Sequence, residues 1–511
     1  YSEDRHELGK MYTKYAAFLE NDIREFDNTH FDIIANEAEA VDPQHRLLME
    51  LSWRALENAG LDIPALKGSN TGVFLGLSSN EYIKYGIASR DVKEITPYSL
   101  FGTAYSAAAG RMAYFYDFKG PAVVNDSACS SSLVALNNAV KSLKAGECDL
   151  AIVGAANIIL DPSTFIGLSR IQALASDGRC KVFDNKADGF GRGEGCGVII
   201  LKRLDDALKE HNQVAAVVKS CAIGQDGRAN GFYAPNGLAE ERVMKRALQL
   251  SGCTSEDIDY IEAHGTGTVL GDYIETQAIS NVYQAEKGPI LVGSVKSNIG
   301  HLEAAAGMAG IIKILLSMKY GQIPPSIHYD EPNKNINQNK IKVVSNLTEW
   351  KKDGNRSAAI NSFGITGTLA HVILEEYKQS HEEETQKIPV SLLTLSAQNA
   401  NALKRSMQNM KNYLENTNLK LTDICYTTNR TRSHLAYRYA MPASKKEDLC
   451  KSLHQALENE EVFEYETRKA QSRKDKVAFL FTGQGSVYQN IAKQLYDYSL
   501  EFQQAFMMCN Q

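Results

Sequence analysis

The stretch PAVVNDSACSSSL, residues 121–133, decides the fold, because a short apolar run passes there directly into a helix. Residues 121–124 predict a buried strand, and apolar residues then recur at helical spacing from Leu133 as far as Gly146, a suitable stop. Cys129 lies at the junction, where unpaired backbone N–H groups and the positive end of the helix dipole favour the thiolate that attacks carbonyl carbon. Taken alone, it fits a buried structural cysteine as well as a nucleophile.

Short apolar runs alternate with helical patterns on both sides of this junction. Asp42 and Pro43 begin one such helix, as N-cap and first residue, and Gly60 ends it. The alternation predicts a layered α/β domain that ends near Glu376. Its expected strands are residues 71–77, 122–125, 150–155, 197–201, 214–221, 260–263, 290–295 and 370–374.

Two further units are expected downstream of a charged connector, residues 377–387. The first combines a strand at residues 390–395 with an amphipathic helix that starts at Ala400. The second starts at Lys476 with a short strand over residues 477–481, followed by a tight GQG turn. The predicted domains are residues 1–377, 378–475 and 476–511.

Composition argues against several classes of function. The 511 residues carry 55 Lys and Arg against 61 Asp and Glu, a net charge of −6, so no nucleic-acid partner is expected. Nine cysteines are scattered without a C-x-x-C pair, which argues against a zinc site or a disulfide framework and for reduced cysteines in the cytoplasm. The apolar stretches are too short, or too interrupted by charge, to span a membrane, and no membrane partner is expected.

Two histidines next to glycines are the other candidates for chemistry. His264 lies in EAHGTGT, residues 262–268, directly after a predicted strand. His301 ends KSNIGH, residues 296–301, at a second strand-to-helix turn. Either histidine alone is more often a structural residue. Together with Cys129 they favour a single site, because glycines let a ligand approach the backbone and ligands in α/β folds collect at the carboxyl ends of strands.

Two glycine-rich loops carry weaker signals. NSFGITGT, residues 361–368, offers backbone N–H groups that can form an oxyanion hole. Residues 183–195 combine Asp184, Arg192 and Glu194 with glycines and allow two interpretations. They form either a phosphate site or an internal lock of arginine–glutamate or aspartate–backbone contacts. The lock is favoured, because the carboxylates would repel an anion.

Four motifs in this order, DSACSSS, EAHGTGT, KSNIGH and NSFG-x-x-GT, carry a specific resemblance. Residues 1–376 resemble the β-ketoacyl synthase (ketosynthase) domain of a modular type I polyketide synthase. Residues 388–473 resemble the linker between ketosynthase and acyltransferase in such enzymes, and residues 477–511 resemble the start of a malonyl-type acyltransferase. The resemblance implies a thiolase-like α/β fold of five α-β-α-β-α layers, and a homodimer.

The resemblance also implies that the chain is a fragment. Tyr1 aligns inside the family's domain, so that the domain's first strand is expected to be missing. No G-x-S-x-G motif, which holds the acyltransferase serine, occurs in the chain. No acyltransferase-domain activity is therefore expected.

Individual roles follow from the resemblance in the same way. It implies that Cys129 is the acylated nucleophile and that Lys296 organises the charges around it. It implies that His264 and His301 bind the thioester carbonyl of the extender unit. The implied partner is an acyl carrier protein, which brings phosphopantetheine, while the chain itself is expected to bind no cofactor or metal. The implied oxyanion hole consists of the backbone N–H groups of Cys129 and Ile365, and the implied substrate contacts are Thr266, Thr268 and Phe363.

The implied reaction is a decarboxylative Claisen condensation of a cysteine-bound acyl chain with a malonyl-type extender, which makes the enzyme an acyltransferase. An iterative synthase of the fatty-acid type shares the same residues. A non-elongating domain that only binds carrier protein and passes acyl chains on stays open, because Leu369 stands where the family usually has asparagine; retention of His264 argues against it. A thiolase or plant-type synthase fits less well, because those enzymes use Cys-His-Asn.

Overall fold

The computed structural model describes residues 1–85, 91–283, 288–378, 389–458 and 488–510, with 478, 480, 483 and 485 as single residues between the last two ranges. The chain forms two compact units, which are described separately. The first comprises Tyr1–Ala59 and Ile63–Gln379, and the second Gly60–Asp62 and Ser380–Gln511.

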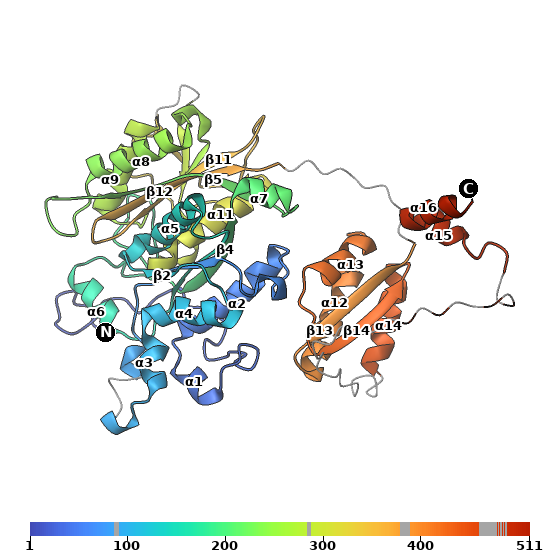
Figure 1. Ribbon diagram of the computed structural model, residues 1–511. Coiled ribbons are helices and arrows are strands. Elements are labelled where there is room, and N and C mark those ends of the chain that lie inside the picture. Colours follow the sequence, from blue (N-terminus) through green and yellow to red (C-terminus); the bar gives the residue numbers. More distant parts are fainter. Residues whose placement is uncertain are drawn as a thin grey trace. The chain divides into compact units, whose positions relative to one another are not determined.

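The first unit contains a four-stranded sheet in the order β2-β1-β3-β4. The central strand β1 is parallel to β2 and β3, and β4 is antiparallel to β3. Helices α2 and α4 cover one face of this sheet (Figure 1). The bounds are β1 Thr71–Gly76, β2 Ala122–Asn125, β3 Leu150–Asn157, β4 Gly195–Lys202, α2 Pro43–Asn58 and α4 Tyr105–Tyr116.

A six-stranded sheet in the order β5-β12-β11-β6-β7-β9 forms the other half of this unit. Strands β11, β6, β7 and β9 are parallel, whereas β12 is antiparallel to both of its neighbours. Helices α8 and α9 pack together on its outer side. The bounds are β5 Ala216–Gln225, β6 Tyr260–Glu262, β7 Ile290–Gly293, β9 Ile341–Val343, β11 Ser357–Phe363, β12 Thr368–Glu376, α8 Gly237–Ser251 and α9 Val269–Val282.

Two helices, α5 (Ser131–Ala145) and α11 (Ala306–Tyr320), lie between the sheets and contact both of them. Both helices bury most of their residues, because each faces a sheet on two sides. The resulting order of helices, sheet, helices, sheet and helices confirms the predicted five-layered, thiolase-like α/β fold. The described part of the first sheet has four strands.

Local sequence signals explain where these elements begin and end. The Asp42 carboxylate accepts a hydrogen bond from the Gln44 backbone N–H at 2.8 Å, and Pro43 is the first residue of α2, as predicted. Gly146 ends α5 in the left-handed conformation, with φ of 73°. Several strands run further than predicted; β3 continues to Asn157, because the burial that defines it continues there.

The second unit pairs β13 (Ser391–Ala397) with β14 (Tyr437–Ala443) in antiparallel register and packs helices against them. Its helices are α12 Ala400–Asn416, α13 Leu421–Arg430 and α14 Lys446–Glu458, followed by α15 Lys493–Tyr498 and α16 Leu500–Cys509. Leu393, Met407 and Leu449 are fully buried at its centre. The strand predicted over residues 477–481 lies mostly outside the described residues.

The remaining α-helices and strands of the described residues are short. They are α1 Ala35–Ala40, α3 Pro97–Thr103, α6 Ser163–Arg170, α7 Leu204–Lys209, α10 Lys296–Ile299, β8 Gln322–Ile323 and β10 Thr348–Glu349.

None of the helices described here combines the length and apolar character needed to cross a bilayer. Within the same described ranges, no three or more His, Cys, Asp or Glu side chains are grouped so that they could hold a metal ion.

Candidate active site

Cys129 lies in a single turn of 3-10 helix, Ala128–Ser130, that joins β2 to α5. Ala128 adopts a left-handed conformation with φ of 53°, so the chain turns sharply at the cysteine. Ser131 Oγ donates to the Ala128 carbonyl at 2.6 Å, and Ser362 Oγ donates to the Cys129 carbonyl at 2.7 Å. The serines next to and opposite the cysteine therefore hold the backbone of this turn.

Burial and, less strongly, the Glu303 carboxylate raise the pKa of the Cys129 thiol to about 12. Lys296 and hydrogen bonds from the backbone N–H groups of Ile365 and of Cys129 itself act in the opposite direction. Together these contributions favour the protonated thiol, and the thiolate expected from the helix start stays a prediction. The two N–H groups implied as an oxyanion hole do converge on the sulfur.

His264 follows β6, at the end of the strand where the sequence places it. Its ring Nδ1 accepts a hydrogen bond from the Phe363 backbone N–H at 3.3 Å. The Glu275 carboxylate accepts the backbone N–H groups of His264 at 2.7 Å and Gly265 at 2.8 Å. A neutral ring whose Nδ1 accepts a hydrogen bond carries its proton on Nε2, so His264 presents an N–H donor there.

His301 follows the short helix α10 and Gly300. It lies in the connection from β7 to α11, where the strand-to-helix turn is predicted, and the KSNI segment adds a short helix to that connection. The Glu303 backbone N–H donates to His301 Nδ1 at 3.0 Å, which again leaves the ring proton on Nε2. The centroids of the His264 and His301 rings are 5.5 Å apart.

Burial lowers the pKa of His264 and of His301 well below the ordinary value, and the nearby Lys296 ammonium lowers both further. Burial also lowers the pKa of Lys296, whereas the Glu262 and Glu275 carboxylates raise it. Both rings are consequently neutral at neutral pH. The site therefore holds neutral imidazoles beside a buried lysine.

Residues 183–195 form an internal lock and wrap His301. Arg192 is fully buried, and its Nε donates to the Glu303 carboxylate at 2.5 Å. The backbone on either side of Arg192 bonds to His301 itself, since Gly191 O accepts from His301 N at 2.7 Å and Gly193 N donates to His301 O at 2.9 Å. Asp184 accepts two backbone N–H groups at 2.7 Å. The internal lock that is favoured for this loop is confirmed.

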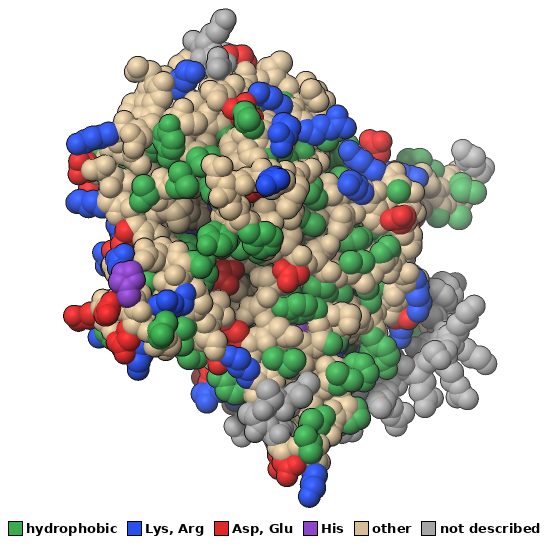
Figure 2. Space-filling model, turned by 90° about the vertical axis from the view of Figure 1, so that its left-hand side faces the viewer, with side chains coloured by type: hydrophobic (Ala, Val, Ile, Leu, Met, Phe, Trp, Pro, Cys, Tyr) green, Lys and Arg blue, Asp and Glu red, His purple; other side chains and the backbone are tan. Residues whose placement is uncertain are grey.

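The exposure of the chain rises from Thr266 through Thr268 toward the surface. Thr266 is buried, Thr268 is half-buried, and Val269 and Leu270 at the start of α9 are exposed. The threonine hydroxyls are 3.0 Å apart. Figure 2 shows the side of the molecule on which α3, α6 and α9 lie, where hydrophobic side chains gather around a hollow.

Sequence reasoning missed the buried carboxylates that shape these loops. Asp272 accepts the backbone N–H groups of Phe183 at 2.8 Å and of Thr266 and Gly267 at 3.1 Å. Glu275, one turn further along α9, holds the His264 segment. Two acidic residues three apart in an otherwise uncharged helix are the available signal.

Leu369 is buried in β12, directly opposite Phe363 of β11. It packs with Phe363 in one hydrophobic cluster. An apolar side chain therefore occupies the position next to the residue that supports His264.

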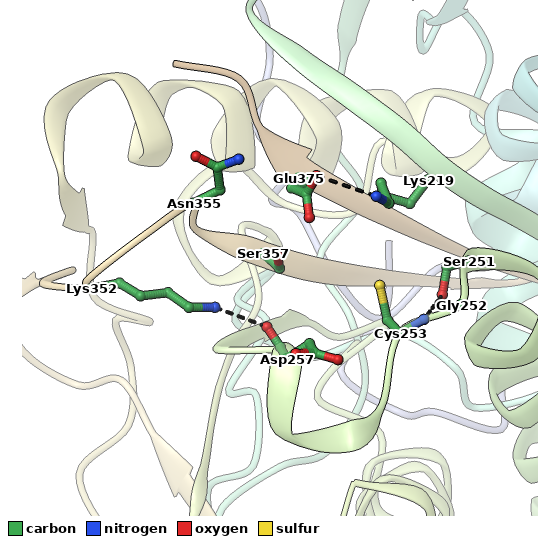
Figure 3. Close-up of a pocket in the computed structure, with 9 residues that line it drawn as sticks. All are labelled: Lys219, Ser251, Gly252, Cys253, Asp257, Lys352, Asn355, Ser357 and Glu375. Carbon is green, nitrogen blue, oxygen red and sulfur yellow. Dashed lines mark hydrogen bonds and ion pairs between the residues drawn. The ribbon is translucent and has the colours of Figure 1, made fainter.

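A cavity of about 420 Å³ lies at the opposite end of the second sheet (Figure 3). It is lined by Ser357, the first residue of β11, whereas Phe363 at the other end of that strand bonds to His264. Its lysines are paired, Lys219 with Glu375 at 3.3 Å and Lys352 with Asp259 at 2.9 Å. This cavity is separate from the cysteine–histidine site.

Three family models match successive parts of the chain. "Beta-ketoacyl synthase, N-terminal domain" matches residues 1–207, "Beta-ketoacyl synthase, C-terminal domain" residues 215–330, and "Ketoacyl-synthetase C-terminal extension" residues 332–441. Fold and family matches define a condensing enzyme of the thiolase-like class. The chain belongs to the β-ketoacyl synthase family, as a ketosynthase.

Two of its relatives are polyketide synthases. Phenolphthiocerol synthesis polyketide synthase type I Pks15/1 of Mycobacterium marinum is 41% identical over 98% of this chain and 24% of the relative. Polyketide synthase GfsA of Streptomyces halstedii is 40% identical over 95% of this chain and 7% of the relative. The chain thus spans less than a quarter of the length of both. The solved ketosynthase from module 6 of the bacillaene synthase of Bacillus subtilis 168 superposes with a TM-score of 0.81 and 36% identity, over 90% of this chain and 78% of that one.

Proposed function

We propose that the chain is a polyketide β-ketoacyl synthase that extends an acyl chain by decarboxylative Claisen condensation. In the first half-reaction, Cys129 Sγ attacks the thioester carbonyl of an acyl carrier protein. The new carbon–sulfur bond replaces the old one, and the thiol proton leaves on the pantetheine sulfur. The reaction is thus an acyl transfer.

In the second half-reaction, the carboxylate carbon–carbon bond of a malonyl thioester breaks and releases carbon dioxide. The electron pair forms an enolate, and the enolate oxygen accepts hydrogen bonds from the Nε2–H groups of His264 and His301. The enolate carbon then attacks the acyl carbonyl on Cys129, the carbon–sulfur bond breaks, and the sulfur regains one proton from solvent. The β-ketoacyl chain leaves on the carrier thioester.

One observation carries the proposal: both rings accept a backbone N–H at Nδ1 and are neutral, so that each offers a fixed N–H donor. Donors that are already oriented stabilise a developing oxyanion without reorganising, and they act most strongly where water is excluded. Lys296 adds positive charge without being able to replace the directional donors.

The pantetheine arm of the carrier protein is the ligand that we assign to Thr266, Thr268 and Phe363. The rise in exposure from Thr266 to Leu270 supports an arm that enters from the surface toward His264. The chain's own residues therefore bind a substrate that carries its phosphopantetheine with it. Nine free cysteines support a reducing, cytoplasmic location for the reaction.

A homodimer through β2 is part of the proposal. β2 is the edge strand of the first sheet as described, and Ala122 and Val123 are exposed on it. An exposed edge strand with apolar side chains pairs readily with a second strand. Pairing of two β2 strands would continue the sheet from one copy into the other, next to the cysteine that follows β2.

A second candidate, a non-elongating domain, is favoured by Leu369 alone, and one experiment separates the two. The purified chain is mixed with acyl and malonyl carrier protein, and both proteins are weighed by intact mass spectrometry. We expect an acylated Cys129 that disappears as a β-ketoacyl carrier protein forms, and no acylation of Cys129→Ala. An acylated cysteine that never yields a β-ketoacyl product would establish the non-elongating function instead.

A further inference from the structure

A chain of buried hydrogen bonds leads away from His264 into the second sheet. Glu275, which accepts the backbone N–H groups of His264 and Gly265, also accepts the Asn361 side-chain amide at 2.8 Å. The Asn361 Oδ1 atom lies 2.5 Å from His371 Nδ1, and His371 Nε2 lies 2.6 Å from the Tyr283 hydroxyl. Every member of this chain is buried.

With Glu275 ionised, the hydrogen bonds in this chain have one consistent set of directions. Both Glu275 oxygens accept backbone N–H groups, so the amide nitrogen of Asn361 must face the carboxylate and donate to it. Asn361 Oδ1 then faces His371 and can only accept, which places the His371 proton on Nδ1. His371 Nε2 must in turn accept from the Tyr283 hydroxyl. Burial lowers the pKa of His371 to about 3, in agreement with a neutral ring.

The network joins one helix to two strands. Asn361 of β11 and His371 of β12 are directly opposite each other in the sheet. They fill the space between Glu275 within α9 and Tyr283 at its end. Because α9 follows the glycine-rich loop that carries His264, this contact fixes that loop relative to the strand whose Phe363 N–H orients the ring.

We propose that Asn361, His371 and Tyr283 are positioning residues for His264, acting through Glu275. The inference rests on the proposed function. His301 is held differently, by the Arg192–Glu303 lock, so that the two rings have independent supports. Loss of the Asn361 network should therefore impair the step that needs both rings and spare the acylation of Cys129.

The experiment measures two rates in the 511-residue chain: acylation of Cys129 by an acyl carrier protein, and decarboxylation of a malonyl carrier protein. Asn361→Asp keeps the shape but replaces the amide donor that faces Glu275 with a second carboxyl group. We expect it to slow decarboxylation on the order of 10- to 100-fold and to leave acylation within about twofold, since small misplacements of a catalytic group cost this much.

His371 provides the graded test and Tyr116 the control. His371→Asn retains a donor near the Nδ1 position, whereas His371→Leu removes it, so decarboxylation should be restored in part only by asparagine. Tyr283→Phe should slow decarboxylation, whereas Tyr116→Phe should not. Tyr116 is also a buried tyrosine, and its hydroxyl lies 2.9 Å from Ser52 Oγ beneath the first sheet.

Two results would overturn the proposal. If both rates fall together in the Asn361 and His371 variants, in step with the thermal unfolding midpoint, the network serves only the general stability of the fold. If neither rate changes in soluble His371→Leu, the network does not position His264. A wild-type chain that acylates but does not decarboxylate would contradict the proposed function itself, and this inference with it.

Discussion

The two halves of the site are built by different means. The first sheet supplies Cys129 through backbone geometry: a left-handed residue and a single tight turn. The carbonyls of that turn are held by the hydroxyls of Ser131 and of Ser362, which comes from β11 of the second sheet. The second sheet supplies His264 and His301 through buried charge, since carboxylates and an arginine fix the loops on which the rings lie. The substrate must reach the nucleophile, whereas the imidazole rings must keep a fixed orientation. Each half of the site is built accordingly.

The largest expected effect separates the two halves by function. His264→Ala and His301→Ala should each lower the decarboxylation rate by about 100- to 1,000-fold, the usual cost of removing one oxyanion donor. Acylation of Cys129 should persist in both. Stopped assays with radiolabelled malonyl and acyl carrier proteins measure the two steps separately. Loss of acylation in the histidine variants would show that the halves do not act separately.

A second prediction concerns the protonation of the nucleophile. Because the pKa of Cys129 is raised to about 12, the rate of its alkylation by iodoacetamide should rise about tenfold per pH unit between pH 7 and 9. Cys129→Ser gives the background from the other cysteines. A plateau of the rate below pH 8 would mean that the helix start does favour a thiolate.

The same shift has a consequence for stability. The folded state binds the thiol proton more tightly than the unfolded chain does, so this contribution to the free energy of unfolding is complete below pH 9 and is lost as the pH rises through about 12. The histidine rings have the opposite effect. Their pKa values are lowered by folding, so their contribution is complete above the ordinary value of 6.5 and falls as the pH drops below it.

The smallest expected effect tests the turn itself. The Ala128 side chain is sterically strained at φ of 53°, so Ala128→Gly should raise the free energy of unfolding by up to about 1 kcal/mol. Gly146, at φ of 73° with open space around it, gives the reverse comparison, and Gly146→Ala should lower the free energy by about 1 kcal/mol. Urea unfolding measures both. A destabilising Ala128→Gly would mean that the turn is not strained.

Much of the fold could be predicted because its signals are local. The N-cap Asp42, the stop at Gly146 and the apolar runs of the strands each depend on neighbours in sequence. The support of the site could not be predicted, because it depends on contacts between distant residues. Glu275 meets Asn361 across 86 positions, and Arg192 meets Glu303 across 111. The raised pKa of Cys129 could not be predicted for the same reason, since burial is a property of the assembled layers.

Nitrogen NMR of histidine-labelled protein tests the central claim most directly, with His264→Ala and His301→Ala to assign the signals. The account predicts that both rings carry a proton on Nε2 alone and keep this form from pH 8 down to below the ordinary pKa of 6.5. A ring that titrates near 6.5, or one that carries its proton on Nδ1, would contradict it, because the paired donors for the enolate oxygen would then be absent.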